Sequence, residues 1–317
     1  MPVSTADVNR QNFNPDNVYM HEMKDGKLLN QFQMPIMADV MKNSVVFKLG
    51  KYQEMNGKSE IGFNYWADKP GAYWVGEGRK IQTTKATMLQ ATMRAHKVAT
   101  IVVVSREYLH YTYSEFFNAL KPQLSEALWT KVDEATILGV DNPFPKSLES
   151  VTAETGKVVT GEMTYDNILA LEDSLLEAGV SPNAFISKTQ NRTGLRGTVD
   201  ATTKEVLYDR KVNTLDGLPI AELESEEMKK GDIYAGDFNK LFYGIPYNIN
   251  YKISEEGQLS TIVNEDGSPV NLYEQELIAL RVTMDVATLV AKDDAFAKLT
   301  SGEVASEPAP DEEVPTL

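Results

Sequence analysis

Residues 65–78 read YWADKPGAYWVGEG, and this stretch joins two segments that have the composition of β-strands. The first segment, Glu60 to Trp66, alternates apolar residues with small or polar ones, and the return segment, Met88 to Ile101, alternates more weakly. The joining stretch contains two turn signals, KPG and GEG. Residues 51–98 are therefore predicted to form a long two-stranded hairpin. Such a polar hairpin buries too little apolar surface to be stable alone, so we expect it to lie on a neighbour.

Aromatic and charged side chains gather at the tip of this predicted hairpin. Trp, Tyr and Arg concentrate binding energy at protein interfaces, so an exposed aromatic cluster on a projecting arm indicates a contact surface. For Tyr65 and Trp66, covering the base of the hairpin is an equal alternative. The predicted subunit-interface residues are Trp66, Tyr73, Trp74, Glu77, Arg79, Lys80 and Lys85.

The first half of the chain otherwise alternates short elements with one long helix. Residues 35–47 have the spacing of a short helix, and Val45 to Leu49 is predicted to start a strand. An apolar stripe with a spacing of three to four residues predicts a helical region from Ser114, as N-cap, to Gly139. Pro122 should kink or divide this region.

The second half has an α+β texture. Amphipathic spacing predicts a helix over Thr164–Ala178, with Thr164 as its cap, and a second helix over Gln190–Val199. The apolar run from Leu272 to Ala291 is predicted to be a long strand, although its period also allows a helix. Asp293 to Leu299 is predicted to be a final short turn. Short strands are expected at Ala184–Ser187, Leu218–Ala221, Ile233–Gly236 and Leu241–Ile245.

Composition and charge limit the classes of protein that fit the chain. Its 317 residues include no cysteine, which excludes disulfides, thiolate metal sites and a cysteine nucleophile. The net charge is −15, most of it beyond residue 140, so a broad basic face for free nucleic acid is not expected. No uncharged apolar run reaches the length of a transmembrane helix, and the polar N-terminus lacks the apolar centre of a signal peptide. We therefore expect the protein to stay in the cytosol where it is made.

The sequence contains few signs of a catalytic or metal-binding site. His21, His96 and His110 are far apart and form no metal-binding pair, and phosphate-loop, dinucleotide and nucleophile-elbow motifs are absent. The adjacent acids Asp133-Glu134 and Glu226-Glu227 are predicted to be solvated. We predict no catalytic residue, no metal and no cofactor, while a hydrolase that uses a carboxylate pair stays as an alternative of a different class.

The order of several short segments adds a resemblance to a known family. They are FNPDNV (13–18), the hairpin stretch 65–78, the helix 129–139, NPF (142–144), FISKTQNR (185–192), LDGLP (215–219), YGIP (243–246) and the run 271–299. In this order they resemble the major capsid proteins of tailed bacteriophages with the Hong Kong 97 type fold, above all those of siphophages of Gram-positive bacteria such as staphylococcal ones.

The resemblance implies an α+β fold made of named parts. Listed along the chain, they are an N-terminal arm (1–35), a peripheral domain with a long spine helix (36–50 and 99–149), an extended β-hairpin loop (51–98), an axial domain (150–270) and a return strand of the peripheral domain (271–300). The acidic, proline-rich composition of the remaining residues predicts a disordered acidic tail (301–317). Some family members crosslink subunits through lysine and asparagine. Lys69, Lys80 and Lys85 lie on the matching loop, but no partner is identified, so the crosslink is not carried over.

The function implied by the resemblance is mechanical. Copies of the chain would assemble as pentamers and hexamers into the icosahedral head that encloses phage double-stranded DNA, without sequence-specific binding. The partners implied are other copies of the chain, a separate scaffolding protein and a portal protein, with no membrane. The location is the virion, and the host cytoplasm during assembly. An encapsulin-type compartment shell shares the fold and is the alternative within the class, and a small-oligomer binding module that uses the aromatic tip is a further alternative.

Overall fold

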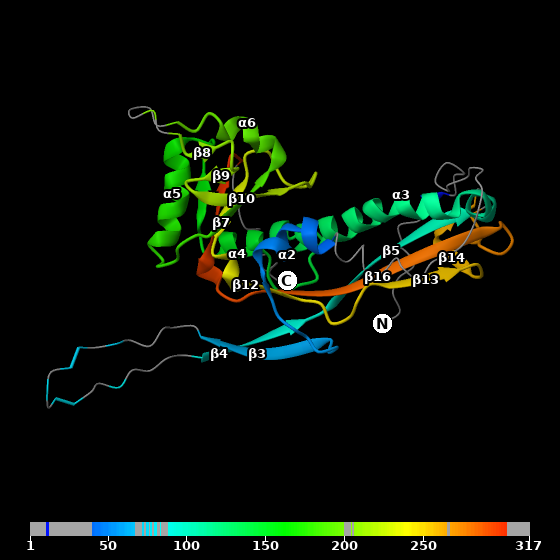
Figure 1. The fold of residues 1–317 in the computed structure, drawn as a ribbon, viewed down its shortest axis with the longest axis horizontal. Coiled ribbons are helices and arrows are strands. Elements are labelled where there is room, and N and C mark those ends of the chain that lie inside the picture. Colours follow the sequence, from blue (N-terminus) through cyan, green and yellow to red (C-terminus); the bar gives the residue numbers. More distant parts are fainter. Residues whose placement is uncertain are drawn as a thin grey trace, which may run out of the picture. The chain divides into compact units, whose positions relative to one another are not determined.

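The computed structural model describes residues 11–12, 40–66, 72, 74–75, 77, 79–80, 83, 88–199, 204, 206–264 and 267–302 (Figure 1). The chain divides into two compact units. Unit 1 takes residues up to 48, 52–133 and 243–288, and unit 2 takes 49–51, 134–242 and the residues from 289 onward. Each unit is therefore built from segments that are distant in the sequence.

Unit 1 is organised around the longest strand, β16 (Leu277–Val290). β5 (His96–Ser105) pairs antiparallel with it from Leu277↔Ser105 to Val286↔His96, and β13 (Asn250–Ser254) pairs antiparallel with residues 279–283. Because both neighbours pair with the same stretch of β16, they lie on its opposite edges. The long helix α3 (Arg106–Asp133) follows β5 directly and packs along it (Figure 1).

Smaller elements complete unit 1. The hairpin of β3 (Glu60–Trp66) and β4 (Met88–Arg94) keeps an unbroken antiparallel register from Glu60↔Arg94 to Trp66↔Met88. The remaining elements are α2 (Val45–Leu49), β1 (Gln11–Asn12), β2 (Lys51–Tyr52), β12 (Leu241–Gly244), β14 (Gln258–Val263) and β15 (Pro269–Asn271), of which α2, β2 and β12 extend across the boundary between the units. β1 pairs parallel with β14, which also pairs antiparallel with β15.

Unit 2 holds a seven-stranded mixed sheet of order β6-β17-β11-β7-β10-β9-β8. Its strands are β6 (Val158–Thr160), β7 (Ala184–Lys188), β8 (Tyr208–Asp209), β9 (Thr214–Leu215), β10 (Leu218–Leu223), β11 (Ile233–Gly236) and β17 (Phe296–Thr300). Its helices are the π-helix η3 (Glu134–Leu138), α4 (Leu148–Glu154), α5 (Tyr165–Leu176), α6 (Arg192–Leu195) and the 3-10 turns η4 (Thr189–Asn191), η5 (Phe238–Lys240) and η6 (Asp293–Ala295).

Two helices cover opposite faces of this sheet. Ile168, Leu171 and Leu175 of α5 join the core that contains Ala297 and Leu299 of β17. Lys298, which lies between those two residues, bonds instead to Glu149 of α4. Because side chains alternate along a strand, α4 and α5 lie on different faces.

Most predicted elements are present. Three predictions in the N-terminal half need correction. Val45–Leu49 is a helix and not the start of a strand, because Ser44 and Asp133 satisfy its first amide groups. The long helix begins at Arg106 rather than Ser114, directly where β5 ends. It also continues through Pro122 undivided, since residues of the stripe on both sides of the proline, such as Leu120 and Leu124, are buried.

Two further predictions fail in the second half. Asp293–Leu299 is not a turn throughout, because the short 3-10 turn is followed by the fully buried strand β17 (Phe296–Thr300). The charged Lys298 interrupts the apolar pattern of this segment, so the sequence did not indicate a buried strand. The helix expected over Gln190–Val199 shrinks to η4 and α6. The run Leu272–Ala291 is a strand, as preferred, but it starts at Leu277.

Candidate assembly surface and buried polar networks

The hairpin β3–β4 is the clearest candidate for a contact surface, and its base is firmly held within unit 1. Met55 and Met93 are buried and pack against Gly244, where an added Cβ would come within 2.7 Å of both side chains. The Ala95 amide donates to the Ser59 carbonyl at 2.8 Å, and the Tyr247 hydroxyl donates to the Gly57 carbonyl. The hairpin therefore leaves the unit from a fixed base.

The predicted interface residues lie on or beyond this hairpin. Trp74 is fully exposed, with a relative accessibility of 105%, and Glu77, Arg79 and Lys80 are also exposed. Trp66 ends β3, where only its backbone is described. Tyr73 and Lys85 lie outside the described residues, as do the arm upstream of residue 40 (apart from Gln11–Asn12) and the tail from residue 303. An exposed Trp at the tip favours a contact role over the covering of the hairpin base, and the interface assignment stays a prediction.

A buried carboxylate joins two distant segments of unit 1. Asp133, at the end of α3, is 1% exposed and accepts hydrogen bonds from the Ser44 hydroxyl at 2.6 Å and from the amides of Val45 and Val46 at 2.8 and 3.1 Å. Burial raises its pKa to about 6, although these donors and Lys48 oppose the shift. The prediction that Asp133 is solvated is therefore wrong. Its neighbour Glu134 accepts a bond from the Ser225 hydroxyl at 2.7 Å.

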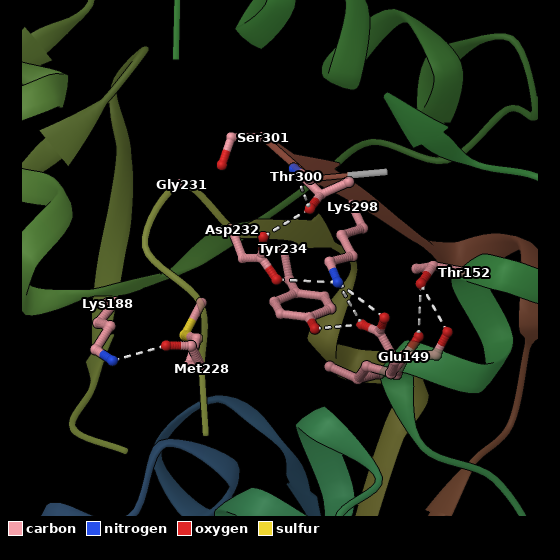
Figure 2. A network of polar contacts seen from close by, with 12 residues as sticks. Glu149, Thr152, Lys188, Met228, Gly231, Asp232, Tyr234, Lys298, Thr300 and Ser301 are labelled. Atoms are coloured by element: carbon pink, nitrogen blue, oxygen red, sulfur yellow. Dashed lines mark hydrogen bonds and ion pairs between the residues drawn. The ribbon is translucent and has the colours of Figure 1, made fainter. Parts of the chain in front are cut away.

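A second buried network lies on the α4 face of the sheet in unit 2 (Figure 2). The Lys298 ammonium donates to both oxygens of Glu149 at 2.8 Å and lies 3.0 Å from an Asp232 oxygen. The Thr300 hydroxyl donates to the other Asp232 oxygen at 2.8 Å. Burial, together with the charge of Glu149, raises the pKa of the Tyr234 phenol, so it stays protonated and donates to Glu149. Every charge in this network therefore has an opposite charge beside it, as buried ions require.

A third site pairs two acids in unit 2. Glu172 of α5 is buried, and its Oε1 atom has no hydrogen-bond donor. Burial, and after it the charge of Asp216 in the turn between β9 and β10, raise its pKa from 4.5 to about 7. A carboxyl held this way keeps its proton near neutral pH. No motif in the sequence marked any of these three networks, because each joins residues that are distant along the chain.

The described residues hold no cluster of three or more His, Asp or Glu side chains that could bind a metal ion. Likewise, none of the helices in the part of the chain that the structure describes is long and apolar enough to cross a membrane. The networks around Asp133 and Lys298 tie helices and strands together inside each unit, which is a structural use of polar groups.

The fold places the chain in a class. It matches a solved structure from Microbacterium phage Oxtober96 with a TM-score of 0.67 at 19% identity, covering 95% of this chain and 99% of that chain. The architecture is the Hong Kong 97 type capsid fold, an α+β fold, as the resemblance implied.

The sequence comparisons give the family. The model of the phage capsid family matches residues 27–301. The chain is 54% identical to the major capsid protein of Staphylococcus phage 80alpha over 310 residues, covering 98% of this chain and 95% of the relative, and 25% identical to the probable major capsid protein of Mycobacterium phage L5 over 298 residues, covering 88% and 90%. The chain belongs to the phage capsid family. It is a structural major capsid protein of the virion and not an enzyme.

Proposed function

We propose that copies of this chain assemble as pentamers and hexamers into the icosahedral head that encloses the double-stranded DNA of a phage. The observation that carries the proposal is the projecting hairpin β3–β4, whose tip exposes a tryptophan and several charges that a monomer has no use for. A hairpin of this kind gains stability by lying on a neighbouring subunit. The self-association of the family supports the same arrangement.

In such a shell, the two units of the chain would correspond to different domains of the capsid subunit. Unit 1 would supply the peripheral domain, with α3 as the spine helix, and unit 2 would supply most of the axial domain that gathers around the symmetry axes. A separate scaffolding protein would direct assembly in the host cytoplasm, a portal protein would occupy one vertex, and the DNA would be enclosed without sequence-specific binding.

Negative-stain microscopy of the protein expressed with and without its scaffolding protein tests this proposal. Closed icosahedral shells of uniform size would support it. A monodisperse monomer or a small ring in both conditions would contradict it.

The basic part of the hairpin gives a finer prediction. Arg79 and Lys80 are exposed and would lie against acidic surface of a neighbour, where charge gives register more than affinity. We expect the double change Arg79→Glu and Lys80→Glu to prevent closed shells while the subunit keeps its circular dichroism spectrum. The matched control is Lys229→Glu with Lys230→Glu, an adjacent pair of exposed bases in unit 2. Normal shells from the hairpin variant would contradict the assigned role.

A further inference from the structure

One face of the sheet in unit 1 carries two cations directly opposite each other, and neither forms an ion pair with another side chain that the structure describes. Residues directly opposite each other in adjacent strands have side chains on the same face. Lys252 of β13 is opposite Arg281 of β16, which is opposite Ile101 of β5. All three are exposed, whereas the alternate residues of β16, Leu280 and Val282, are buried on the other face.

Within the described part of the chain, the next rows on this face do not neutralise it. The next row on the same face holds Asn250, Thr283 and Ala99, which are uncharged, and the following row sets Lys97 opposite Asp285. Like charges directly opposite each other in a sheet are destabilising. Beside them, Ile101 is 51% exposed although a β-branched apolar residue favours burial. The row is therefore suited to a partner that brings negative charge together with an apolar side chain.

Unit 2 carries a surface of the opposite kind on α5. Asp173 and Glu177 are exposed and four residues apart, which places two negative charges on the same side of the helix. Glu177 also stands at the C-terminal end, where the helix dipole disfavours an acid, and the last turn contains no base. Leu176 beside them is 51% exposed. This end of α5 therefore combines two like charges with an exposed aliphatic side chain, as the sheet face does, but its charges are negative.

We propose that these two surfaces meet between copies: the sheet face around Lys252, Arg281 and Ile101 of one subunit contacts the C-terminal end of α5, with Asp173, Leu176 and Glu177, of a neighbouring subunit. The inference rests on the proposed function, since it names one contact of the proposed shell. A contact between two different surfaces of identical subunits is a head-to-tail contact, and it closes into a ring when the rotation allows. The charges cancel across it, and the two aliphatic side chains cover each other.

A protein partner fits the sheet face better than packaged DNA does. The DNA backbone would satisfy the two cations, but its phosphates offer no partner to an exposed isoleucine in the same row. A neighbouring copy supplies both kinds of group from one turn of helix.

Charge exchange tests the contact. Lys252→Glu with Arg281→Glu replaces one like-charge pair by another, so the repulsion within the subunit should stay the same. Asp173→Lys with Glu177→Lys places bases at the C-terminal end of α5, where the helix dipole favours them. We expect each double variant to raise the protein concentration needed for shell formation about tenfold or more, and the four changes together to restore it to near the wild-type value. Shells are counted by sedimentation and negative-stain microscopy, with circular dichroism as the check on folding.

Matched controls and outcomes separate the alternatives. Glu226→Lys with Glu227→Lys reverses two exposed acids elsewhere in unit 2 and should neither block assembly nor rescue the sheet-face variant. The proposal is overturned if single-surface variants assemble normally, if the combined variant is not restored, or if the sheet-face variant forms normal shells that lose only DNA. If wild-type protein forms no shells with its scaffolding protein, the proposed function fails first.

Discussion

At the scale of single residues, Asp133 shows how one side chain can hold two segments 88 residues apart. Its two oxygens accept from a hydroxyl and two amides, and its side chain is withdrawn from solvent. Leaving a buried donor unpaired costs about 1–3 kcal/mol, more than the roughly 1 kcal/mol net gain of an ordinary hydrogen bond. The fold of unit 1 therefore depends on the chemical identity of this group and not only on its size.

Asp133→Asn tests this dependence. The amide nitrogen would replace one acceptor oxygen, so at least one donor among Ser44, Val45 and Val46 would face another donor. We expect a loss of about 1–3 kcal/mol in the free energy of unfolding of the unassembled subunit, measured by urea titration. Glu126→Gln, an exposed change on the same helix, should leave the value within about 0.5 kcal/mol. Equal stability of both variants would contradict the role of the carboxylate.

Glu172 predicts a pH dependence of the stability of the subunit. Its pKa in the folded protein, about 7, lies above its ordinary value of 4.5, because burial and Asp216 disfavour the charge. The folded state therefore holds the proton more tightly. The stabilising contribution is complete below about pH 4.5, falls by about 1.4 kcal/mol per pH unit towards pH 7, and is lost above it.

Glu172→Gln removes this titration. We expect the free energy of unfolding to fall less between pH 5 and pH 7 in the variant than in the wild type. Urea unfolding at each pH measures this fall. Glu226→Gln, an exposed acid in the same unit, should keep the wild-type slope. An unchanged slope in Glu172→Gln would show that another group carries the dependence.

At the scale of elements, the base of the hairpin β3–β4 depends on a close approach of backbone and side chains. Gly244→Ala would place a Cβ within 2.7 Å of Met55 and Met93, which are buried and cannot both move away without cost. We expect a loss of about 1–3 kcal/mol in stability and faster proteolytic cleavage near the hairpin. Gly62→Ala, within β3, meets the flexible end of Gln90 at 3.3 Å and the Ala91 carbonyl oxygen at an ordinary contact distance of 3.9 Å, so this variant should be cleaved at the wild-type rate.

The elements also show what a sequence can predict. Periodicity and turn chemistry located β3, β11 and α5 with its Thr164 cap correctly, since those signals are local. β17 and α2 were misassigned because each depends on distant partners: β17 is covered on both faces, and α2 is capped by Asp133. The buried network around Lys298 was missed for the same reason, because three separate segments bring its groups together.

Among the candidate site residues, the aromatic cluster between turn signals predicted an exposed hairpin tip, and its role as an interface stays a prediction. Trp74 has the exposure that an interface residue needs. The sheet face around Arg281 could not be found in the sequence, since its three members come from strands whose register only the structure gives.

At the scale of the whole molecule, the chain forms two units built from interleaved segments. Each unit has to be folded before assembly, although its surface carries like charges close together and exposed aliphatic side chains. In the proposed shell, the like-charge pairs and exposed aliphatic residues would be compensated by neighbouring subunits. A ligand or partner that binds only the folded state raises its apparent stability, and in a shell the partners are other copies. On the proposed function, we therefore expect the stability of this protein to depend on assembly.

This predicts a specific difference between subunit and shell. We expect the unassembled subunit to unfold at a temperature at least about 10 °C below that of the assembled shell, as measured by scanning calorimetry, because each subunit in a shell buries several interfaces. The Arg79→Glu and Lys80→Glu variant, which should remain unassembled, should unfold at the temperature of the wild-type subunit. If subunit and shell unfolded at the same temperature, the exposed surfaces would contribute nothing on assembly, and the stabilising role assigned to the contacts would be wrong.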